Sequence, residues 1–440
     1  MASTINATGS GIVLTGSTSA ALNLLVGGSA ALSIGTGATT TISNATITSL
    51  TISNPSTFPA GSASAPVITT TGDTNTGVYF PAADQVAVTA GGTVAAAFNT
   101  NGLFFRNRII NGDMRIDQRN AGASVTFDNN VFPVDRFRGF TNLSSKATAQ
   151  QSSVVPTGFV NSVLVTSSSA YSLAAGDYFG IGQRIEGTNI SDLGWGTASA
   201  RAVTLSFWVR SSLTGTFGGA LGNSNGTRSY PFTYSISVAD TWEYKTITVP
   251  GDTSGTWLTT NGSGIQFVIS LGAGATLSGT AGAWAGANYF SATGAVSVIS
   301  TNGATFYLTG VQLETGSVAT PFERRPFGTE LALCQRYYWK GGNGASGIFN
   351  SGTTARFGVT FPVVMRASPT VAAIAAPIIA NPTVSEAQTG SQTTDFLATA
   401  TGGAVENYSA SKIQFGGFSS GADGRPCSLS NTCLSFSSEL

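Results

Sequence analysis

The chain of 440 residues carries 20 basic and 20 acidic side chains, so its net charge is zero, and only 9% of its residues are charged. Because an average soluble domain has roughly 25% charged residues, the composition shows no electrostatic footprint for nucleic acid or for an anionic membrane. Histidine is absent, which removes the commonest general base, the commonest metal ligand and the usual partner of a nucleophilic Ser or Cys.

Residues 1–60 are expected to form an N-terminal fibrous β stem. Leu22, Leu24 and Val26 recur at every second position, which is strand periodicity on very short pieces. Pieces this short cannot bury enough apolar surface within one chain. Two interpretations stay open, a disordered leader or a stem whose strands are completed by identical chains, and the aliphatic residues favour the stem. Such a stem makes the chain a trimer or a higher cyclic oligomer.

The N-terminal sequence MASTINATGSG has no basic residue before an apolar stretch, so we expect neither a secretory signal nor a secreted adhesin. The apolar stretch 20–34 is interrupted by Asn, Gly and Ser and is too short to span a bilayer. Among the three cysteines, two reduced thiols at Cys427 and Cys433 are favoured over a disulfide loop. Together with Cys334 they lack a fourth soft ligand for zinc, and we expect no metal and no cofactor.

Residues 61–105 are expected to form a short β shaft after a proline-containing linker, with turns at TTTGDTNTG and TAGGT. No Lys or Arg precedes Arg106, where the composition changes. Six of the 20 basic residues lie between Arg106 and Arg138, interleaved with four aspartates. Mixed signs at this density indicate a salt-bridged junction or a strand surface rather than a nucleic-acid patch.

From about 150 to 325 the sequence predicts strands separated by glycine turns, which is typical of an antiparallel β-sandwich or jelly roll. The strand RAVTLSFWVRSS places one apolar set on its core face and a more polar set on the other. The core set is Val203, Leu205, Phe207 and Val209, and the opposite set is Thr204, Ser206, Trp208 and Arg210. Further strands are predicted in WEYKTITVPGD, GIQFVISLGAG and GATFYLTGVQLE.

Thr329 is expected to cap a short helix through ELALCQRYY, after which the chain returns to short strands. The predicted fold class is therefore all-β. Its parts are a stem in residues 1–60, a shaft in 61–105, a central jelly roll in 106–328 and a C-terminal β-sandwich tip in 329–440.

Two long strings resemble one domain of bacteriophage and prophage tail-fibre proteins. NRIINGDMRIDQRNAGASVT (107–126), followed by FPVDRFRGF (132–140), is similar to the opening of that domain. GATFYLTGVQLETGSVATPFERRPFGTELALCQRYYWK (303–340) is similar to its closing signature. The strands between them also match in order, so the resemblance covers about 106–340. Weaker resemblances to phage-fibre segments cover 71–93 and the C-terminal residues.

This resemblance implies a virion appendage, a homotrimeric tail fibre made in the bacterial host cytoplasm, with a jelly roll related in shape to carbohydrate-binding modules. The implied partners are other phage tail or virion proteins, through the N-terminal segment, and a host cell-surface glycan. Related modules often hold a structural calcium. Here Arg115 stands where a Glu would follow the opening motif, and Thr309-Gly310 replace an acidic pair, which argues against a calcium site. An Arg115–Glu314 pair could replace the ion, although an unrelated ion pair is favoured.

We expect the function to be binding to the host surface without catalysis. A tailspike glycan depolymerase needs two carboxylates about 5–10 Å apart, for which Asp113 with Asp117, or Asp177 with Glu186, are the candidates. No string resembles a hydrolase motif, and the titratable groups that an active site concentrates are sparse. A purely structural fibre, collar or capsid-attached component stays open, because the sequence does not separate it from a receptor-binding fibre.

If a glycan is bound, aromatic side chains are the candidates, because sugars present apolar C–H faces that stack on flat rings. Trp208 and Arg210 lie on the strand face opposite the core, which is solvated or forms a ligand groove in a sandwich. Trp195, Trp257 and Trp284 lie in glycine-rich turns that could gather at one end of the sandwich. A hydrophobic plug under a loop is an equally open interpretation of these three.

Overall fold

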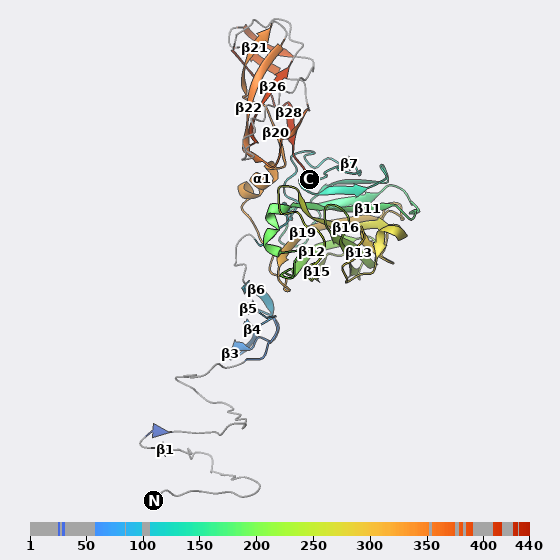
Figure 1. Ribbon diagram of the computed structural model, residues 1–440, viewed down its shortest axis with the longest axis vertical. Coiled ribbons are helices and arrows are strands. Elements are labelled where there is room, and N and C mark those ends of the chain that lie inside the picture. Colours follow the sequence, from blue (N-terminus) through green and yellow to red (C-terminus); the bar gives the residue numbers. More distant parts are fainter. Residues whose placement is uncertain are drawn as a thin grey trace, which may run out of the picture. The chain divides into compact units, whose positions relative to one another are not determined.

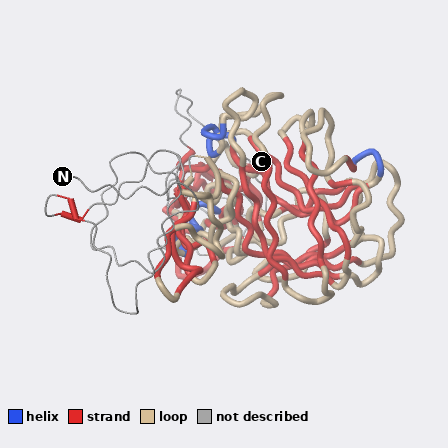
Figure 2. Tube along the Cα trace, turned by 90° about the horizontal axis from the view of Figure 1, so that it is seen from below, coloured by secondary structure: helices blue, strands red, loops and turns tan. Residues whose placement is uncertain are grey.

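The computed structural model describes residues 58–83, 85–98, 106–351, 354–374, 378–381, 384–389, 408–415, 426–429 and 431–440, and one strand pair, β1 (Leu25–Val26) with β2 (Ser29–Ala30). The chain divides into two compact units, Met1–Phe58 and Pro59–Leu440. Apart from that strand pair and residues 58–60, the predicted stem lies outside the described residues, and the four-part division stays a prediction. Strands and loops make up nearly all of the described chain (Figure 2), which confirms the all-β class.

Residues 68–98 form one antiparallel sheet in the order β3-β4-β5-β6. Its strands are β3 (Ile68–Thr70), β4 (Asp73–Tyr79), β5 (Val86–Ala90) and β6 (Thr93–Phe98). Gly91 and Gly92 take positive φ in the second turn, as a glycine pair allows. The first turn is shorter than the sequence predicts, because the strand β4 already begins at Asp73 and leaves only Thr71 and Gly72 to turn.

Residues 106–320 contain the β-sandwich, which consists of two antiparallel sheets (Figure 1). The first, here called the front sheet, has the order β15 (Glu243–Val249), β12 (Val203–Ser211), β19 (Thr305–Thr315), β10 (Ser162–Ser167), β9 (Ala147–Ser152), β7 (Val125–Thr126). The second, the back sheet, has the order β14 (Ser229–Ile236), β13 (Gly215–Gly222), β16 (Ser263–Ala273), β11 (Tyr178–Glu186), β8 (Arg138–Thr141).

The core lies between these two sheets, and the strand β12 has the predicted register. Val203, Leu205, Phe207 and Val209 have no exposed surface and belong to one apolar cluster with side chains of the back sheet. Successive side chains of a strand point to opposite faces, so Trp208 and Arg210 lie on the outer face of the front sheet, where both are half-buried.

A second, smaller apolar cluster covers the outer face of the back sheet. Phe140 and Val268 of that sheet contact Phe290, which belongs to the segment that follows the strand β16. This segment contains the 3-10 helix η3 (Ala275–Leu277) and the short parallel pair β17 (Ser278–Gly279) and β18 (Ser291–Ala292). Two further 3-10 turns, η1 (Gly187–Asn189) and η2 (Ser191–Leu193), follow the strand β11.

The one α-helix of the described residues, α1 (Phe327–Gln335), begins two residues earlier than the predicted cap. Pro326 occupies the N-cap position and makes no side-chain cap hydrogen bond, while its carbonyl accepts the amide of Glu330. Thr329 therefore lies within the first helical turn, and its assignment as the N-cap was wrong. A proline beside the first turn loses nothing, because the amides there have no intrahelical partner.

Two sheets follow the helix α1. The smaller has the order β20 (Tyr338–Gly341), β28 (Leu434–Ser437), β23 (Thr370–Ala373). The larger has the order β25 (Val384–Thr389), β24 (Ile378–Asn381), β27 (Pro426–Leu429), β21 (Ser346–Ser351), β22 (Thr354–Met365), β26 (Tyr408–Phe415). Phe357, Phe361 and Phe436 belong to their core. Cys427 and Cys433 are buried there as free thiols, and burial raises the pKa of Cys427 to about 11.

The charged segment 106–138 forms a buried, salt-bridged junction with the C-terminal residues, as its mixed charge predicts. Glu439 pairs with Arg119 at 2.9 Å and also with Arg136. The Arg136 guanidinium lies 3.5 Å from the centre of the Tyr337 ring, which makes a cation–π contact. Since Arg136 is 2% exposed and the strand β28 ends two residues before Glu439, these ion pairs join the sandwich to the C-terminal sheets.

A second part of the same junction surrounds Glu186 at the end of the strand β11. Glu186 is 1% exposed and accepts two hydrogen bonds from Arg336, at 2.7 and 3.0 Å, and a third from the Tyr337 hydroxyl at 2.7 Å. Burial opposes the charge of this carboxylate, but the bonds from Arg336 and Tyr337 outweigh burial and hold its pKa below the ordinary value. Glu186 thus stabilises the junction through these hydrogen bonds.

The suggested pair between Arg115 and Glu314 does not form. Arg115 pairs instead with Asp113 at 2.5 Å and donates to the Arg325 carbonyl. Glu314 accepts hydrogen bonds from Gln312 and from the backbone and side chain of Thr320. Asp113 and Glu314 each bind donors that are close to them in the sequence, so Arg115 and Glu314 do not pair.

Asp135 gives the junction a pH dependence. Burial raises the pKa of this carboxyl group to about 6, against the opposing effect of Arg119. The unfolded value is about 3.9, so the stability that protonated Asp135 contributes is fully present below that pH and is lost as pH rises through about 6. Urea unfolding of the wild type and Asp135→Asn should show the variant gaining relative to the wild type between pH 4 and pH 7. A constant difference over this range would contradict the raised pKa.

Candidate functional site

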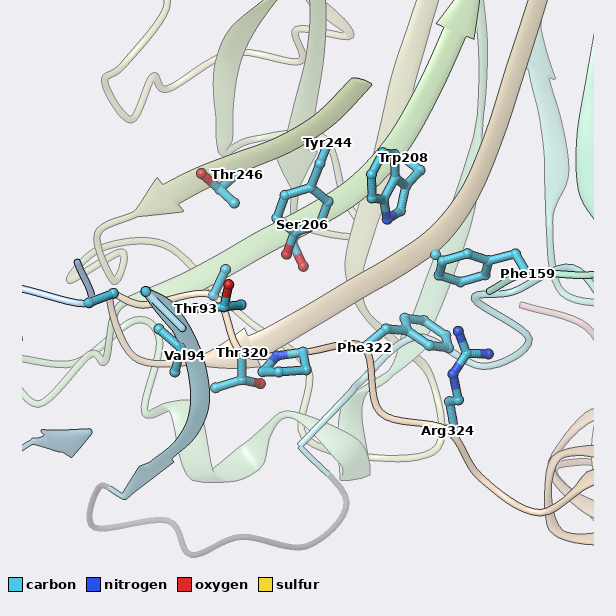
Figure 3. A pocket seen from close by; sticks show the side chains of 15 residues that line it. Thr93, Val94, Phe159, Ser206, Trp208, Tyr244, Thr246, Thr320, Phe322 and Arg324 are labelled. Carbon is cyan, nitrogen blue, oxygen red and sulfur yellow. The ribbon is translucent and has the colours of Figure 1, made fainter. Parts of the chain in front are cut away.

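A pocket of about 650 Å³ opens on the outer face of the front sheet (Figure 3). Trp208 of the strand β12 and Tyr244 of the strand β15 line one side, and Phe159, Phe322 and Arg324 line another. The hydroxyl-bearing residues of the lining are Thr93, Ser206, Tyr244, Thr246 and Thr320. No carboxylate is among the described residues that line it. The pocket thus combines flat rings, neutral hydroxyl groups and a single guanidinium.

The pairing of two strands places the first two rings. Trp208 lies directly opposite Tyr244 in the antiparallel register of β12 and β15, with ring centres 5.4 Å apart. Cross-strand neighbours on one face come this close by the geometry of the sheet. Tyr244 is 43% exposed although it is a large aromatic residue. Figure 3 shows the indole nitrogen on the pocket side of the Trp208 ring, where it can donate a hydrogen bond.

Gly310 makes room for the next ring. It sits where the register of β12 and β19 shifts between Ser206 and Trp208, with φ of +61°. A Cβ at this position would lie 2.7 Å from the Phe159 ring and 3.0 Å from Cδ1 of Trp208. Both the left-handed conformation and the close rings therefore require glycine.

The rings of Phe159 and Phe322 lie against the guanidinium group of Arg324 at the edge of the pocket. Their rings meet edge to face with centres 5.4 Å apart. Arg324 lies over both, 4.7 Å from the centre of Phe159 and 5.7 Å from that of Phe322. Its Nη2 donates to the Gly158 carbonyl at 2.5 Å. Cation–π contacts and this hydrogen bond hold an exposed charge at one edge of the pocket.

The rest of the outer face beside the pocket is covered by the segment 316–322. Thr204 and Ser206, predicted on the outer face, do lie there but are only 1% and 2% exposed. Thr204 donates to the Gly316 carbonyl, and Glu314 of the strand β19 holds Thr320. This segment therefore covers part of the front sheet beside the pocket and leaves Trp208 and Tyr244 open.

Arg210, expected beside Trp208, does not line the pocket. Its Nε and Nη2 donate to the backbone and carboxylate of Asp240, at 2.8 and 3.2 Å. Its guanidinium also lies 5.0 Å from the centre of the Tyr307 ring. Asp240 thus neutralises Arg210.

Trp195, Trp257 and Trp284 do gather, as the sequence suggests, but as part of the core. Each pair of rings meets edge to face, with centres 4.7 to 5.5 Å apart. Each indole nitrogen donates to a backbone carbonyl, of Arg201, Ser254 and Pro250 respectively. Trp195 and Trp257 are 6% and 7% exposed, and Trp284 packs against the same cluster. The three rings therefore form a hydrophobic plug under the loops. Because Trp195 and Trp257 are buried, their selection as residues that stack on a sugar is corrected.

The carboxylate pairs suggested for a hydrolase are engaged elsewhere. Asp177 and Glu186 lie at opposite ends of the strand β11, so a rise of about 3.3 Å per residue separates them by roughly 30 Å. Asp117 accepts the backbone amides of Asn120 and Gly122, while Asp113 pairs with Arg115. Across the described residues no cluster of three or more Cys, Asp or Glu side chains could hold a metal ion. The described helices are also too short or too polar to cross a membrane.

Sequence reasoning missed Tyr244, Phe159, Phe322 and Arg324. Side chains alternate along WEYKTITV, so Tyr244 lies on the other face of the strand from the inward-facing Ile247. The pairing of β12 with β15 would therefore have identified Tyr244 as a neighbour of Trp208. The other three belong to segments without regular secondary structure, which only the fold brings together. Trp208 is the predicted site residue that the pocket includes.

Replacing Gly310 by alanine should displace the rings of the pocket. The left-handed conformation alone costs about 1–2 kcal/mol for a residue with a Cβ, and the contact with Phe159 adds to this. Gly303→Ala is the matched control, because Gly303 also has a positive φ, of +74°, but nothing lies within 4 Å of its added Cβ. Thermal unfolding and near-UV circular dichroism should show a larger effect for Gly310→Ala. Equal effects would show that the rings do not depend on this glycine.

Comparisons with known proteins add structural neighbours of low similarity. No family model matches the chain, and no curated protein matches it. An enzymatically active domain of tailspike protein 4 from bacteriophage CBA120 has a TM-score of 0.27 and 13% identity, over 48% of this chain and 21% of that one. A putative sugar-binding protein from Bacteroides thetaiotaomicron has a TM-score of 0.29 and 12% identity, over 48% of this chain and 100% of that one.

A family 11 carbohydrate-binding module from a Clostridium thermocellum cellulase has a TM-score of 0.22 and 16% identity, over 44% of this chain and 96% of that one. The chain thus spans about a fifth of the length of the tailspike chain. TM-scores this low do not assign a function, so the functional proposal depends on the chemistry of the pocket.

Proposed function

We propose that the chain is the glycan-binding part of a bacteriophage tail fibre, which attaches the virion to its host without cleaving the glycan. The observation that carries the glycan-binding part is the pocket of the front sheet, where Trp208, Tyr244 and Phe159 present rings beside neutral hydroxyl groups. Large apolar rings are normally buried, so half-exposed ones around a concave surface favour a ligand.

The chemistry of these groups matches a sugar. One face of a pyranose ring carries C–H groups, which stack on an aromatic ring, and its edge carries hydroxyl groups that need hydrogen-bond partners. Trp208 offers a ring and an indole N–H donor, and the exposed Thr246 offers a hydroxyl group. A binding surface of this kind does not need the titratable groups with shifted pKa values that an active site concentrates.

The tail-fibre part of the proposal is supported by the strings at 107–126 and 303–340, which resemble tail-fibre sequences. In this proposal the chain forms a homotrimer, its N-terminal segment binds other tail or virion proteins, and the virion is its location. A purely structural fibre or collar component is the alternative.

Binding of purified full-length protein to an array of bacterial surface glycans tests the proposal. Trp208→Ala should weaken binding to the glycan that the wild type recognises by roughly 5- to 150-fold, because a stacked ring contributes about 1–3 kcal/mol in the related case of nucleobases. Trp208→Phe, which keeps a ring, should retain part of the binding. The glycan should also stay intact, without release of reducing ends.

Three outcomes would contradict the proposal. Trp208→Ala binding as the wild type would place the ligand elsewhere, and release of reducing ends would make the protein a depolymerase. Failure to bind any glycan, with normal folding, would favour the purely structural component.

A further inference from the structure

We propose that the glycan bound in this pocket carries an anionic substituent, a carboxylate or a phosphate, and that Arg324 selects it. The inference rests on the proposed function, because it names the class of glycan that the same site takes. It follows from the charge of the pocket, whose lining combines one guanidinium with no described carboxylate.

The charge of Arg324 acts on the carboxylate of Asp113, but Arg324 forms no ion pair among the described residues. Its hydrogen bond goes to a neutral carbonyl, of Gly158, through Nη2 alone. The nearby carboxylate of Asp113 is bonded to Arg115 at 2.5 Å. A guanidinium with free donors binds carboxylate and phosphate through paired hydrogen bonds, which is the geometry that arginine favours.

The neighbours of Arg324 in the sequence show why this arginine faces the pocket. Glu323 accepts the backbone amides of Arg106 and Asn107, and Arg325 donates to Glu330 and to the Asn107 carbonyl. Both side chains are therefore held on the junction side of the segment. Phe322 and Arg324 lie on the other side and line the pocket, as Figure 3 shows.

Arg210 provides an internal comparison. Like Arg324, it lies on an aromatic ring at the outer surface of the sandwich. Unlike Arg324, it pairs with a carboxylate, that of Asp240. The two arginines share a contact with an aromatic ring, but only Arg210 has an ion pair. Replacing each by glutamine therefore shows whether a loss of ligand preference comes from an unpaired charge or from removing any arginine on an outer ring.

The test compares acidic glycans with neutral counterparts of the same backbone. Uronic-acid polysaccharides are assayed before and after reduction of their carboxyl groups to alcohols, and phosphorylated polysaccharides before and after dephosphorylation. Full-length wild type should bind at least one acidic form about tenfold more tightly than its neutral form, since a hydrogen bond to a charged group contributes about this much. The member that binds identifies carboxylate or phosphate.

The variants assign this preference to Arg324. Arg324→Gln should lose the preference, Arg324→Lys should keep part of it, and Arg210→Gln should keep all of it. The preference should also weaken between about 0.05 and 0.5 M salt, because an exposed charge is screened. Near-UV circular dichroism checks that each variant keeps its fold. If Arg324→Gln does not fold, Arg324→Lys still tests the role of the guanidinium group.

Each contrary result has one meaning. Equal binding of acidic and neutral forms, with Trp208→Ala still weakening both, would overturn the anionic ligand and leave the glycan site standing. A preference that survives in Arg324→Gln would overturn the role of Arg324. Failure of the wild type to bind any glycan would refute the proposed function, and this inference with it.

Discussion

Phe207→Ala should lower the free energy of unfolding by about 3–5 kcal/mol, the range for truncating a buried phenylalanine. Phe207 has no exposed surface, and its ring meets that of Tyr234, from the opposite sheet, edge-on with centres 5.1 Å apart. Removing the ring leaves a cavity between the two sheets, and the surrounding side chains relax only partly into it. Urea unfolding followed by tryptophan fluorescence measures the loss.

Trp208→Ala is the matched control for this change. Trp208 is the next residue of the same strand, but it lies on the outer face and is half-buried. Its truncation should cost less stability than that of Phe207 and should weaken glycan binding. Unfolding by Trp208→Ala with tolerance of Phe207→Ala would contradict the strand register described here.

Arg336→Met should also destabilise the protein by about 3 kcal/mol, the low end of the cost of leaving a buried charge without its partner, because Glu186 is buried while the Arg336 side chain is 34% exposed. Arg336 supplies two hydrogen bonds to Glu186, which is 1% exposed. Without Arg336, the Glu186 carboxylate keeps the hydrogen bond of Tyr337 and remains charged in a buried site. Circular dichroism during urea unfolding at pH 7 measures the effect.

The pH dependence of this loss identifies its cause. Arg336 and Tyr337 hold the pKa of Glu186 below its ordinary value. The stability that Glu186 contributes is therefore present above the unfolded pKa of about 4.3 and is lost as pH falls through the lower folded value. The difference between the wild type and Arg336→Met should shrink below pH 4.

Arg210→Met is the control for the buried pair. Its partner Asp240 has a side chain that is 57% exposed, so this surface pair should contribute no more than about 1 kcal/mol. Equal losses for Arg210→Met and Arg336→Met would show that the junction does not depend on buried charge.

The sequence by itself determined the class of fold and the faces of the strands. Alternation in VTLSFWVR identifies Phe207 as core and Trp208 as outer, because side chains of a strand alternate whatever the rest of the fold does. The mixed charges of 106–138 indicate a salt-bridged junction or a strand surface, and the structure shows the junction, where these charges are buried because they are paired. The residues of the tail-fibre-like strings, such as Arg136 and Glu330, turn out to be members of that junction.

Only the tertiary structure decided which aromatic side chains are open. Trp195, Trp257 and Trp284 share the glycine-rich setting of a binding loop, yet their rings pack on one another and two are buried. Periodicity does not apply to turns, so their exposure depends on which other loops they meet.

The pocket itself could not be predicted for a related reason. Trp208 and Arg324 are 116 residues apart in the sequence, and no local pattern brings them to one surface. Their approach depends on the strand pairing of β12 with β19 and on the course of the segment 316–324 across the front sheet. Side chains from such segments meet because the sheets bury their apolar faces, and that burial is a property of the whole sandwich.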